Sequence, residues 1–475
     1  MDNTRQSTDV LADSERLART AADYFREHKL VVVASRVRLI EWLLDFFDEY
    51  ELPPPLLVLG DATGAPIPDR AFQLQIPGNS VAQWRRNLEE QLLAPDAGLV
   101  ALLDAYDPQR QAVVFTPPLN HGHKELLKRR CIAWRRPQWA QYEDKVVSDA
   151  FWQRAGVTGL RSVITDLSLA GLGQAFEECD EGHGVVVSGD SSYGVLSGGT
   201  GVARARTTAE LPNVLEFLEG RCRQVRVSPF VEGIACTTHG MVLQKETAVY
   251  RPVEGINLRE SGTRFPFTGC STYWTPPERE SEFIREIVRK VGDRLREEAG
   301  YLGSYGVDGI VTEHGFRPTE INARMGGFIV NGGPAEGVPL DLVNAMVMEG
   351  EESGIDAAAL ERTMIDGFRR IDLIKLFLPA QPDFPGGAVQ DVALHYTSGS
   401  YVVSGADEPA DVHVRRITTP VGATLVLEFP DRPFYRNRTL GNFAVSALKS
   451  ASRIMGITLP DYSYPQDISP RGTGE

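Results

Sequence analysis

The sequence predicts a protein of the α/β class that begins with a parallel, doubly wound sheet. Short apolar runs of the kind found in buried strands lie at 30–34, 56–59 and 112–115. Apolar residues at helical spacing precede and follow the first run, at Leu17, Ala21, Phe25, Leu39, Leu43 and Phe46. Strands that alternate with amphipathic helices are typical of a parallel sheet covered on both faces.

The middle of the chain, from about 132 to 350, is rich in strands and glycine. Strands are predicted at 185–187, 225–231, 237–243 and 247–250. Apolar residues from Phe283 to Leu295 form the stripe of one helix, and Gly300 stands where a C-terminal cap belongs. The last part mixes short strands at 392–396, 401–404 and 424–429 with one helix near 443–455. We therefore expect three domains, at 1–130, 131–350 and 351–475.

Composition excludes several classes of protein. The 475 residues include 49 Lys+Arg and 64 Asp+Glu, so the net charge is −15 and nucleic acid is not expected to be a partner. No apolar run approaches the ~18 residues of a membrane span, and the polar start lacks a signal core. The five cysteines are scattered without a CxxC pair, which favours buried free thiols. We expect a cytoplasmic protein with no membrane segment.

The strongest pattern in the chain is DGIVTEHGFRPTEINARMGG, at 308–327. We expect strands at 308–313 and 317–322 around a three-residue loop, His314–Phe316, in which Gly315 supplies a positive φ. With this loop the two strands pair so that Glu313 lies opposite Arg317.

The same register places Asp308 opposite Asn322 and Ile310 opposite Glu320. Because side chains alternate between the two faces of a strand, Asp308, Glu320 and Asn322 then share one face. Three oxygen ligands on one face suit Mg²⁺, whose other positions water and phosphate would fill. The alternative is an ordinary acidic hairpin that leads into a glycine turn.

The sequence EINARMGG, with an Asp twelve residues before its Glu, closely resembles the end of the ATP-grasp fold. The resemblance implies that Asp308, Glu320 and Asn322 bind Mg²⁺, with Mn²⁺ as a substitute. It also implies that Arg324 contacts phosphate or an acyl-phosphate. The match extends over about 132–350.

Other pieces resemble this superfamily in the same order. The stretch 143–157 resembles its opening helix, where Lys145 would reach the nucleotide phosphates. The stretch 184–202 resembles the strand and phosphate loop of its lid, which would occupy about 157–230. The stretch 227–236 resembles the linker that clamps adenine, with Phe230 and Val231 against the ring. The resemblance further implies a Rossmann-like pre-ATP-grasp domain before the core and a small α/β segment after it.

The glycine-rich loop is the expected phosphate cradle, because glycine permits close approach of backbone amides to an anion. Its residues are Ser197, Gly198, Gly199, Thr200 and Gly201. A flexible linker is the alternative. Two positions depart from the superfamily pattern: Ser188 stands where most members have a lysine, and Ala235 where many have a ribose-binding glutamate. Glu232 is the candidate substitute for the latter.

Several polar residues lie between the linker and the long helix. Of Arg251, Arg259 and Arg264 we favour Arg251 as a catalytic residue, with Glu254 as its partner, because it ends a strand before Pro252. A surface salt bridge is the alternative for each arginine. We expect a structural role for His239 and for His314.

The superfamily implies an ATP-dependent carboxylate–amine ligase. Such an enzyme phosphorylates a carboxylate with ATP, and an amine then displaces phosphate from the acyl-phosphate to form an amide or peptide bond. Amino acids or a small peptide are the expected substrates, and a homodimer is the expected assembly. The alternatives are an ATP-grasp kinase that phosphorylates a small molecule and a non-catalytic nucleotide-binding module.

Overall fold

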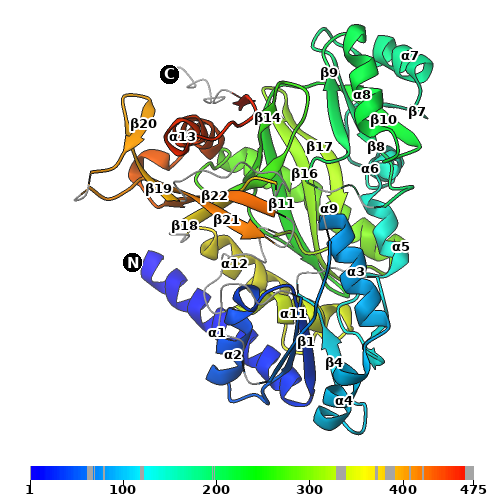
Figure 1. The fold of residues 1–475 in the computed structure, drawn as a ribbon, viewed down its shortest axis with the longest axis vertical. Coiled ribbons are helices and arrows are strands. Elements are labelled where there is room, and N and C mark those ends of the chain that lie inside the picture. Colours follow the sequence, from blue (N-terminus) through cyan, green and yellow to red (C-terminus); the bar gives the residue numbers. More distant parts are fainter. Residues whose placement is uncertain are drawn as a thin grey trace.

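In the residues that it describes, the computed structural model has four sheets of four or more strands (Figure 1). It describes residues 2–60, 68, 70–78, 81–117, 122–194, 196, 198–327, 338–369, 373–379, 391–405, 408–419 and 422–465. A parallel sheet near the N-terminus and a small antiparallel sheet lie at opposite ends of the molecule, on either side of a large central sheet.

The N-terminal sheet is parallel, as the alternation of strands and helices predicts. Its order is β3-β2-β1-β4, and its strands are β1 (Leu30–Ala34), β2 (Leu56–Leu59), β3 (Ala71–Gln73) and β4 (Val113–Phe115). The helices around it are α1 (Asp2–Arg26), η1 (Val37–Leu39), α2 (Glu41–Glu49), α3 (Val81–Leu93) and α4 (Ala97–Tyr106). Alternate residues of β1 enter two different apolar cores, so both faces of the sheet are covered.

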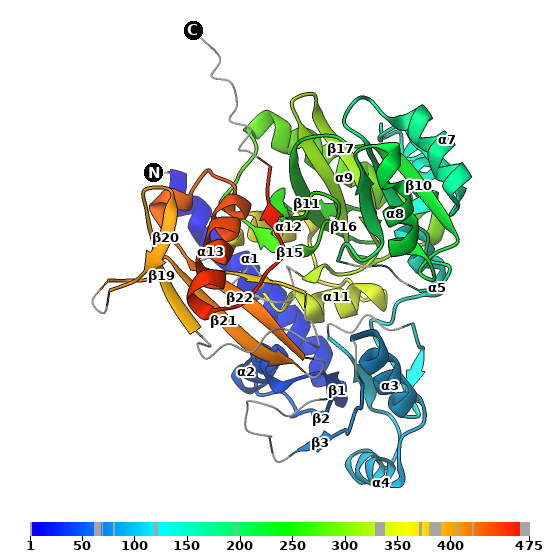
Figure 2. The same cartoon turned by 45° about the horizontal axis from the view of Figure 1, so that its top comes forward.

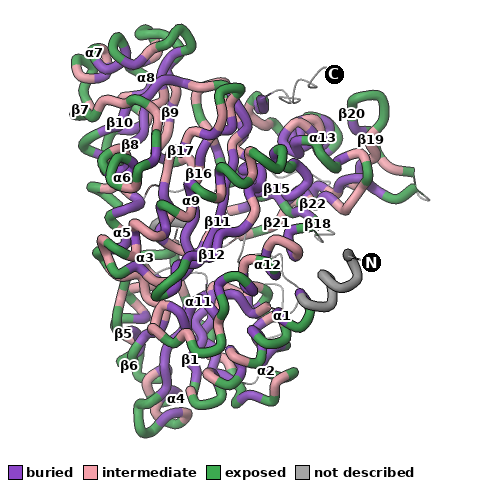
Figure 3. Tube along the Cα trace, turned by 180° about the vertical axis from the view of Figure 1, so that it is seen from behind, coloured by how far each residue is buried: buried purple, intermediate pink, exposed green. Residues whose placement is uncertain are grey.

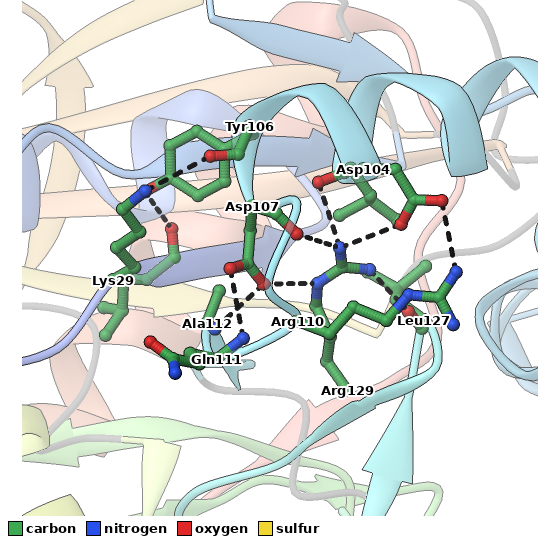
Figure 4. A network of polar contacts seen from close by, with 11 residues as sticks. Lys29, Asp104, Tyr106, Asp107, Arg110, Gln111, Ala112, Leu127 and Arg129 are labelled. Atoms are coloured by element: carbon green, nitrogen blue, oxygen red, sulfur yellow. Dashed lines mark hydrogen bonds and ion pairs between the residues drawn. The ribbon is translucent and has the colours of Figure 1, made fainter.

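A buried ion pair fixes the hairpin that leaves this sheet. The hairpin consists of β5 (Glu125–Leu126) and β6 (Arg129–Arg130). Arg129 Nε lies 3.0 Å from Asp107 Oδ2 at the end of α4, and Asp107 also accepts hydrogen bonds from the backbone of Gln111 and Ala112 (Figure 4). Because both charged groups have several partners, these contacts offset the desolvation cost of burying the pair.

The small antiparallel sheet has the order β7-β10-β8-β9 and carries helices on one face. Its strands are β7 (Val163–Asp166), β8 (Val185–Gly189), β9 (Val202–Ala205) and β10 (Gln224–Pro229). Its helical segments are α7 (Leu169–Cys179), η4 (Thr208–Glu210) and α8 (Leu211–Leu218), of which α7 and α8 share one apolar core with the strands. The segments α5 (Pro137–Ala140), η2 (Gln141–Glu143), η3 (Lys145–Val147) and α6 (Ser148–Arg154) precede it.

The central sheet forms the middle of the molecule and runs in the order β15-β13-β11-β16-β17, with β12 paired to β11. Its strands are β11 (Ile234–Val242), β12 (Thr247–Val249), β13 (Val253–Asn257), β15 (Phe267–Ser271), β16 (Gly303–Thr312) and β17 (Gly315–Asn322). The predicted long helix is α9 (Glu278–Ala299), and it ends at Gly300 with a left-handed φ of 57° as expected. Buried positions concentrate on these strands (Figure 3).

The C-terminal sheet has the order β18-β22-β21-β19-β20 and packs against the last helix (Figure 2). Its strands are β18 (Leu373–Phe377), β19 (Asp391–Thr397), β20 (Ser400–Val403), β21 (Val412–Thr419) and β22 (Gly422–Pro430). The segments η5 (Pro433–Tyr435) and α13 (Leu440–Met455) follow it, and β23 (Tyr462–Ser463) then pairs with β14 (Arg259–Glu260). The two helices α11 (Leu340–Met348) and α12 (Ala357–Gly367) join the core of α1 instead.

All five cysteines are buried and free, as predicted. None of the helices in the described ranges is both long and apolar enough to cross a membrane.

Candidate functional site

The hairpin of β16 and β17 has a different register from the one that the sequence predicts. Thr312 pairs with Gly315, so the turn has two residues, Glu313 and His314, and the predicted three-residue loop is wrong. Gly315 has the expected positive φ, of 94°. Farther along, Asp308 lies opposite Glu320, so the predicted pairing of Asp308 with Asn322 is also wrong.

A β-bulge explains why the three predicted ligands still share one face. The register shifts between Asp308 and Gly309, where Thr319 is the extra residue of β17. One extra residue restores the alternation that a two-residue turn would otherwise have reversed. Asp308 and Glu320 face each other directly, and Asn322 Nδ2 donates to Asp308 Oδ2 at 2.9 Å. Pro318 stands beside the bulge on an edge strand, the positions to which proline is largely confined within sheets.

The surroundings of Asp308 disfavour the charged form of its carboxyl group. Burial and, after it, the charge of Glu320 raise the pKa of Asp308 to about 6. Hydrogen bonds from Thr237 and Asn322 and the charge of Lys145 oppose this shift. Two carboxylates that face each other at a half-buried position favour a bound cation, because a cation would relieve both burial and repulsion.

Lys145 forms an ion pair with one of the predicted metal ligands. It lies in η3, its side chain is only 9% exposed, and its Nζ is 2.9 Å from Glu320 Oε1. The neighbouring Asp144 accepts hydrogen bonds from the backbone and hydroxyl of Ser191, which follows β8. The segment that precedes the small sheet is therefore joined both to that sheet and to the bulged hairpin.

Arg324 follows the hairpin and is also paired. Its guanidinium forms an ion pair with Glu143, which in turn lies 2.7 Å from Arg135. Burial, with the nearby charges of Arg135 and Arg85, lowers the pKa of Arg324 to about 10. Arg324 is therefore cationic at neutral pH, and a guanidinium on the pocket wall suits an anionic ligand.

One pocket joins these groups to the small sheet, the linker that follows β10 and the C-terminal segment. Of the predicted site residues, it is lined by Lys145, Ser188, Gly198, Gly199, Phe230, Val231, Asp308, Glu320, Asn322 and Arg324. Of the described predicted residues, Thr200, Gly201, Glu232 and Arg251 do not line it. Ser197 lies outside the described residues. Ten of the predicted site residues thus line a single pocket, and they include its two carboxylates.

The glycine-rich loop packs against the segment that precedes β15. Gly198 O accepts a hydrogen bond from Phe267 N at 3.3 Å, and Arg204 N donates to Thr263 O at 2.7 Å. Gly199 has a φ of 84°, and a Cβ atom there would lie 2.0 Å from Phe265 O. Only glycine fits this close approach, so the loop is held over the pocket by contacts that depend on its composition.

The linker carries an aromatic residue stacked by arginine. The guanidinium carbon of Arg204 is 3.4 Å from the centroid of the Phe230 ring, and Phe265 stacks on the same ring with centroids 6.4 Å apart. Glu232, the predicted ribose partner, instead pairs with Arg259, which also lies 5.2 Å from the Phe230 ring. The linker side chains are thus mutually packed.

Arg251 and Glu254 do not form the predicted pair. The Arg251 guanidinium donates to Thr272 O at 2.8 Å and to Thr275 Oγ1 at 2.7 Å. Glu254 is fully buried and accepts hydrogen bonds from Leu440 N and Gly441 N at the start of α13. A carboxylate at a helix N-terminus is favourable, so Glu254 fastens the last helix to the central sheet.

Thr237, His239 and Arg226 line the pocket although the sequence analysis gave none of them a place in the site. Thr237 and His239 on β11 lie on the same face as Asp308, because Thr237 pairs with Asp308 and His239 with Gly306. Arg226 on β10 lies directly opposite Ser188 and is held by both carboxylate oxygens of Asp149. The alternation of Thr237 and His239 along a predicted strand was visible in the sequence, but the pairing of β11 with β16 was not.

The donor set fits a hard divalent cation. Asp308, Glu320 and Asn322 offer oxygen ligands, which Mg²⁺ prefers, and two of the three are carboxylates. Within the described ranges no cluster of three or more His, Cys, Asp or Glu could hold a metal ion. An all-protein cage is therefore not built here, and the set suits a cation that takes its other ligands from water and a bound anion.

Comparisons with known proteins show the fold. Neither protein-family models nor curated proteins match this sequence. The biotin carboxylase domain of a 2-oxoglutarate carboxylase from Hydrogenobacter thermophilus, solved as a dimer with MgADP, ADP and bicarbonate, is 15% identical, with a TM-score of 0.53 and 91% of each chain covered. A β-γ-ATP complex of biotin carboxylase from Campylobacter jejuni is 12% identical, with a TM-score of 0.50 and 92% of this chain and 93% of that chain covered. The chain therefore has the ATP-grasp fold that its sequence motifs resemble.

Proposed function

We propose that this protein is an ATP-dependent carboxylate–amine ligase that acts through an acyl-phosphate. One observation carries the proposal: Asp308, Glu320 and Asn322 share a face of a bulged hairpin, inside a pocket that Lys145 and Arg324 also line. Acidic ligands for a cation and basic ligands for phosphate are thus adjacent. Similar solved structures of this fold hold ADP with magnesium or an ATP compound, which supports the choice of nucleotide.

Each part of the pocket has a proposed role. Asp308, Glu320 and Asn322 would hold Mg²⁺, which supplies charge neutralisation for the phosphates when bound. Lys145 and the backbone amides of Gly198 and Gly199 would contact phosphate oxygens, with Ser188 at their edge. Phe230 and Val231 would lie at the adenine, and Glu232 would be at the ribose only if its pair with Arg259 opens.

The proposed chemistry uses two substitutions in sequence. A carboxylate oxygen of the acid attacks the γ-phosphorus, the bond to the β–γ bridging oxygen breaks, and ADP leaves. The amine then attacks the acyl carbon, phosphate leaves, and the nitrogen loses a proton. Arg324 would hold the oxyanions of the acyl-phosphate, and the glycine loop would exclude the water that hydrolyses it. We assign no step to Arg251, because it lies outside the pocket lining.

The proposal extends to the division into domains, the assembly and the partners. The domains would be 1–130, 131–350 with a lid at about 157–230, and 351–475. A homodimer would be the assembly, since one similar structure is a dimer. The partners would be ATP, a small carboxylic acid and an amine, with amino acids or a small peptide as the first candidates.

The test is a screen for ADP release over amino acids and their pairs, followed by identification of the product. ADP, phosphate and an amide in equal amounts support the ligase. ADP with a stable phosphorylated acceptor supports a kinase, and no nucleotide turnover with any substrate supports a binding module. Glu320→Gln removes one of the proposed metal ligands and should abolish the ADP release found in this screen. Glu313→Gln is its matched control, because Glu313 lies in the turn of the same hairpin and its side chain is 71% exposed.

A further inference from the structure

His239 is a buried imidazole on the wall of the pocket, without a role in the proposed chemistry. It lies on β11 and pairs with Gly306 of β16, which in turn pairs with Asn322 of β17. Two residues along the strands, on the same face of the sheet, Thr237 lies opposite Asp308, and Asp308 lies opposite Glu320. His239 therefore lies on the face that carries the proposed metal ligands, one row away from the two carboxylates.

The imidazole lacks a hydrogen-bond partner at one nitrogen. His239 is 6% exposed, and its Nδ1 has no partner within the described part of the chain. Leaving a buried polar atom unpaired costs free energy, so such atoms are rare unless water or a ligand completes them. Burial also lowers the pKa of His239, to about 4, so its ring is neutral and carries one N–H.

Two glycines make room for the ring. A Cβ atom at Gly326 would lie 2.2 Å from His239 Nε2, and one at Gly306 would lie 3.0 Å from Cδ2. Both glycines therefore contact the Cδ2–Nε2 edge, and Nδ1 lies at the opposite edge of the ring. Gly326 follows Arg324 at the end of the stretch 308–327. His239 and Gly326 both line the pocket, so the imidazole and this glycine form one part of its wall.

The neighbouring charges indicate what kind of group would meet this ring. A cationic group of a ligand would bind to the nearby carboxylates of Asp308 and Glu320 in preference to the neutral His239 ring. Arg324 lines the same pocket, and a neutral imidazole in a pocket that also holds an arginine can donate a hydrogen bond to an oxyanion. We propose that His239 donates a hydrogen bond to a carboxylate oxygen of the acid substrate and so positions it.

This inference rests on the proposed function, since it takes the acid of that reaction as the ligand. It goes beyond the sequence interpretation, in which His239 had only a structural role. His239 would touch the substrate and would take part in no bond cleavage. Its removal should therefore weaken binding of the acid more than binding of the nucleotide.

The first experiment is NMR on the full chain with ¹⁵N-labelled histidine. The chain has eight histidines, and His239→Asn identifies the ring signals of His239 by their loss. Titration with acetate should shift these signals saturably, and methylammonium should not. No shift with acetate, or a shift with methylammonium instead, would overturn the proposal. A shift with inorganic phosphate but not acetate would overturn the choice of carboxylate.

The second experiment uses the acid found by the ADP-release screen. His239→Leu should raise the KM for that acid about tenfold, as expected for one lost hydrogen bond to a charged group, with the KM for ATP within about twofold. His239→Gln should recover part of the loss, because it keeps a donor. His314→Asn is the control, since His314 lies in the exposed hairpin turn.

The two experiments separate the possible failures. Equal increases in KM for the acid and for ATP, or an unchanged KM for the acid, contradict a contact to the acid. If the wild-type protein releases no ADP with any acid, the proposed function fails, and the NMR titration still decides whether His239 contacts a carboxylate. If His239→Leu does not fold, the wild-type titration gives the answer alone.

Discussion

Lys145 Nζ lies 2.9 Å from Glu320 Oε1, so the residue proposed for phosphate and a residue proposed for metal neutralise each other. Both side chains are largely buried, at 9% and 23% exposure. Without this ion pair, the Lys145 ammonium and the Glu320 carboxylate would each be a largely buried charge with no opposite charge beside it. In our account MgATP replaces this pair, because the cation takes Glu320 and a phosphate takes Lys145.

This pair predicts a coupling between two substitutions. Lys145→Met and Glu320→Gln should each destabilise the protein by about 1–3 kcal/mol, because each leaves one buried group without its partner. The double variant should lose less than the sum of the two. Urea unfolding measures these free energies, and strictly additive losses would contradict the pairing. Calorimetry should show about tenfold weaker ADP binding for Lys145→Met.

Asp308 predicts an opposition between stability and function. Its pKa is raised to about 6, so the folded protein favours the protonated form, and Asp308 costs stability as pH rises from about 4 through 6. Asp308→Asn should therefore stabilise the ligand-free protein by about 1–2 kcal/mol at pH 8 and by little at pH 4. Thermal unfolding across this pH range measures the difference, and a constant difference would refute the assignment. The same variant should lose turnover.

The glycine loop predicts a strong effect of one methyl group. Gly199→Ala would place Cβ 2.0 Å from Phe265 O at a φ of 84°, so the loop must leave its present position. We expect at least about tenfold slower ADP release with little change in Tm, because the loop lies outside the apolar cores. Gly173→Ala in α7 is the matched control, since its Cβ would meet nothing within 4 Å. Equal rates for both variants would contradict a lid role.

Two half-buried arginines predict opposite phenotypes. Arg324 lines the pocket, whereas Arg251 binds the segment that follows β15 through Thr272 and Thr275. Arg324→Ala should reduce turnover by about a hundredfold or more, the scale for loss of one oxyanion donor. Arg251→Ala should instead reduce stability by about 1–3 kcal/mol and keep most turnover at a temperature where it is folded. Steady-state rates and Tm values together decide, and the reverse pattern would restore Arg251 to the site.

The local motifs were predictable because their chemistry lies within a few residues. The helix that ends at Gly300 has an apolar stripe and a C-terminal glycine, and the first strands are short apolar runs. Asp308, Glu320 and Asn322 were placed on one face, but through a wrong register. The bulge at Thr319 could have been suspected from Pro318, because proline within a strand marks an edge or a bulge.

Long-range contacts were not predictable from one sequence. Nothing near Glu254 in the chain indicates that its partners are Leu440 and Gly441, which lie in another domain of the predicted division. His239 likewise gained its place only when β11 paired with β16. Tertiary pairing decides which of several similar polar residues reach the pocket, whereas spacing decides only which ones share a face.

The most direct measurement of the central claim is a crystal structure with Mg²⁺ and a non-hydrolysable ATP analogue. Our account predicts a cation about 2.0–2.1 Å from oxygens of Asp308 and Glu320, with the analogue's phosphates beneath the loop at Gly198–Gly199 and Lys145 released from Glu320. A nucleotide bound elsewhere, or this pocket without a cation while Lys145 still holds Glu320, would contradict it.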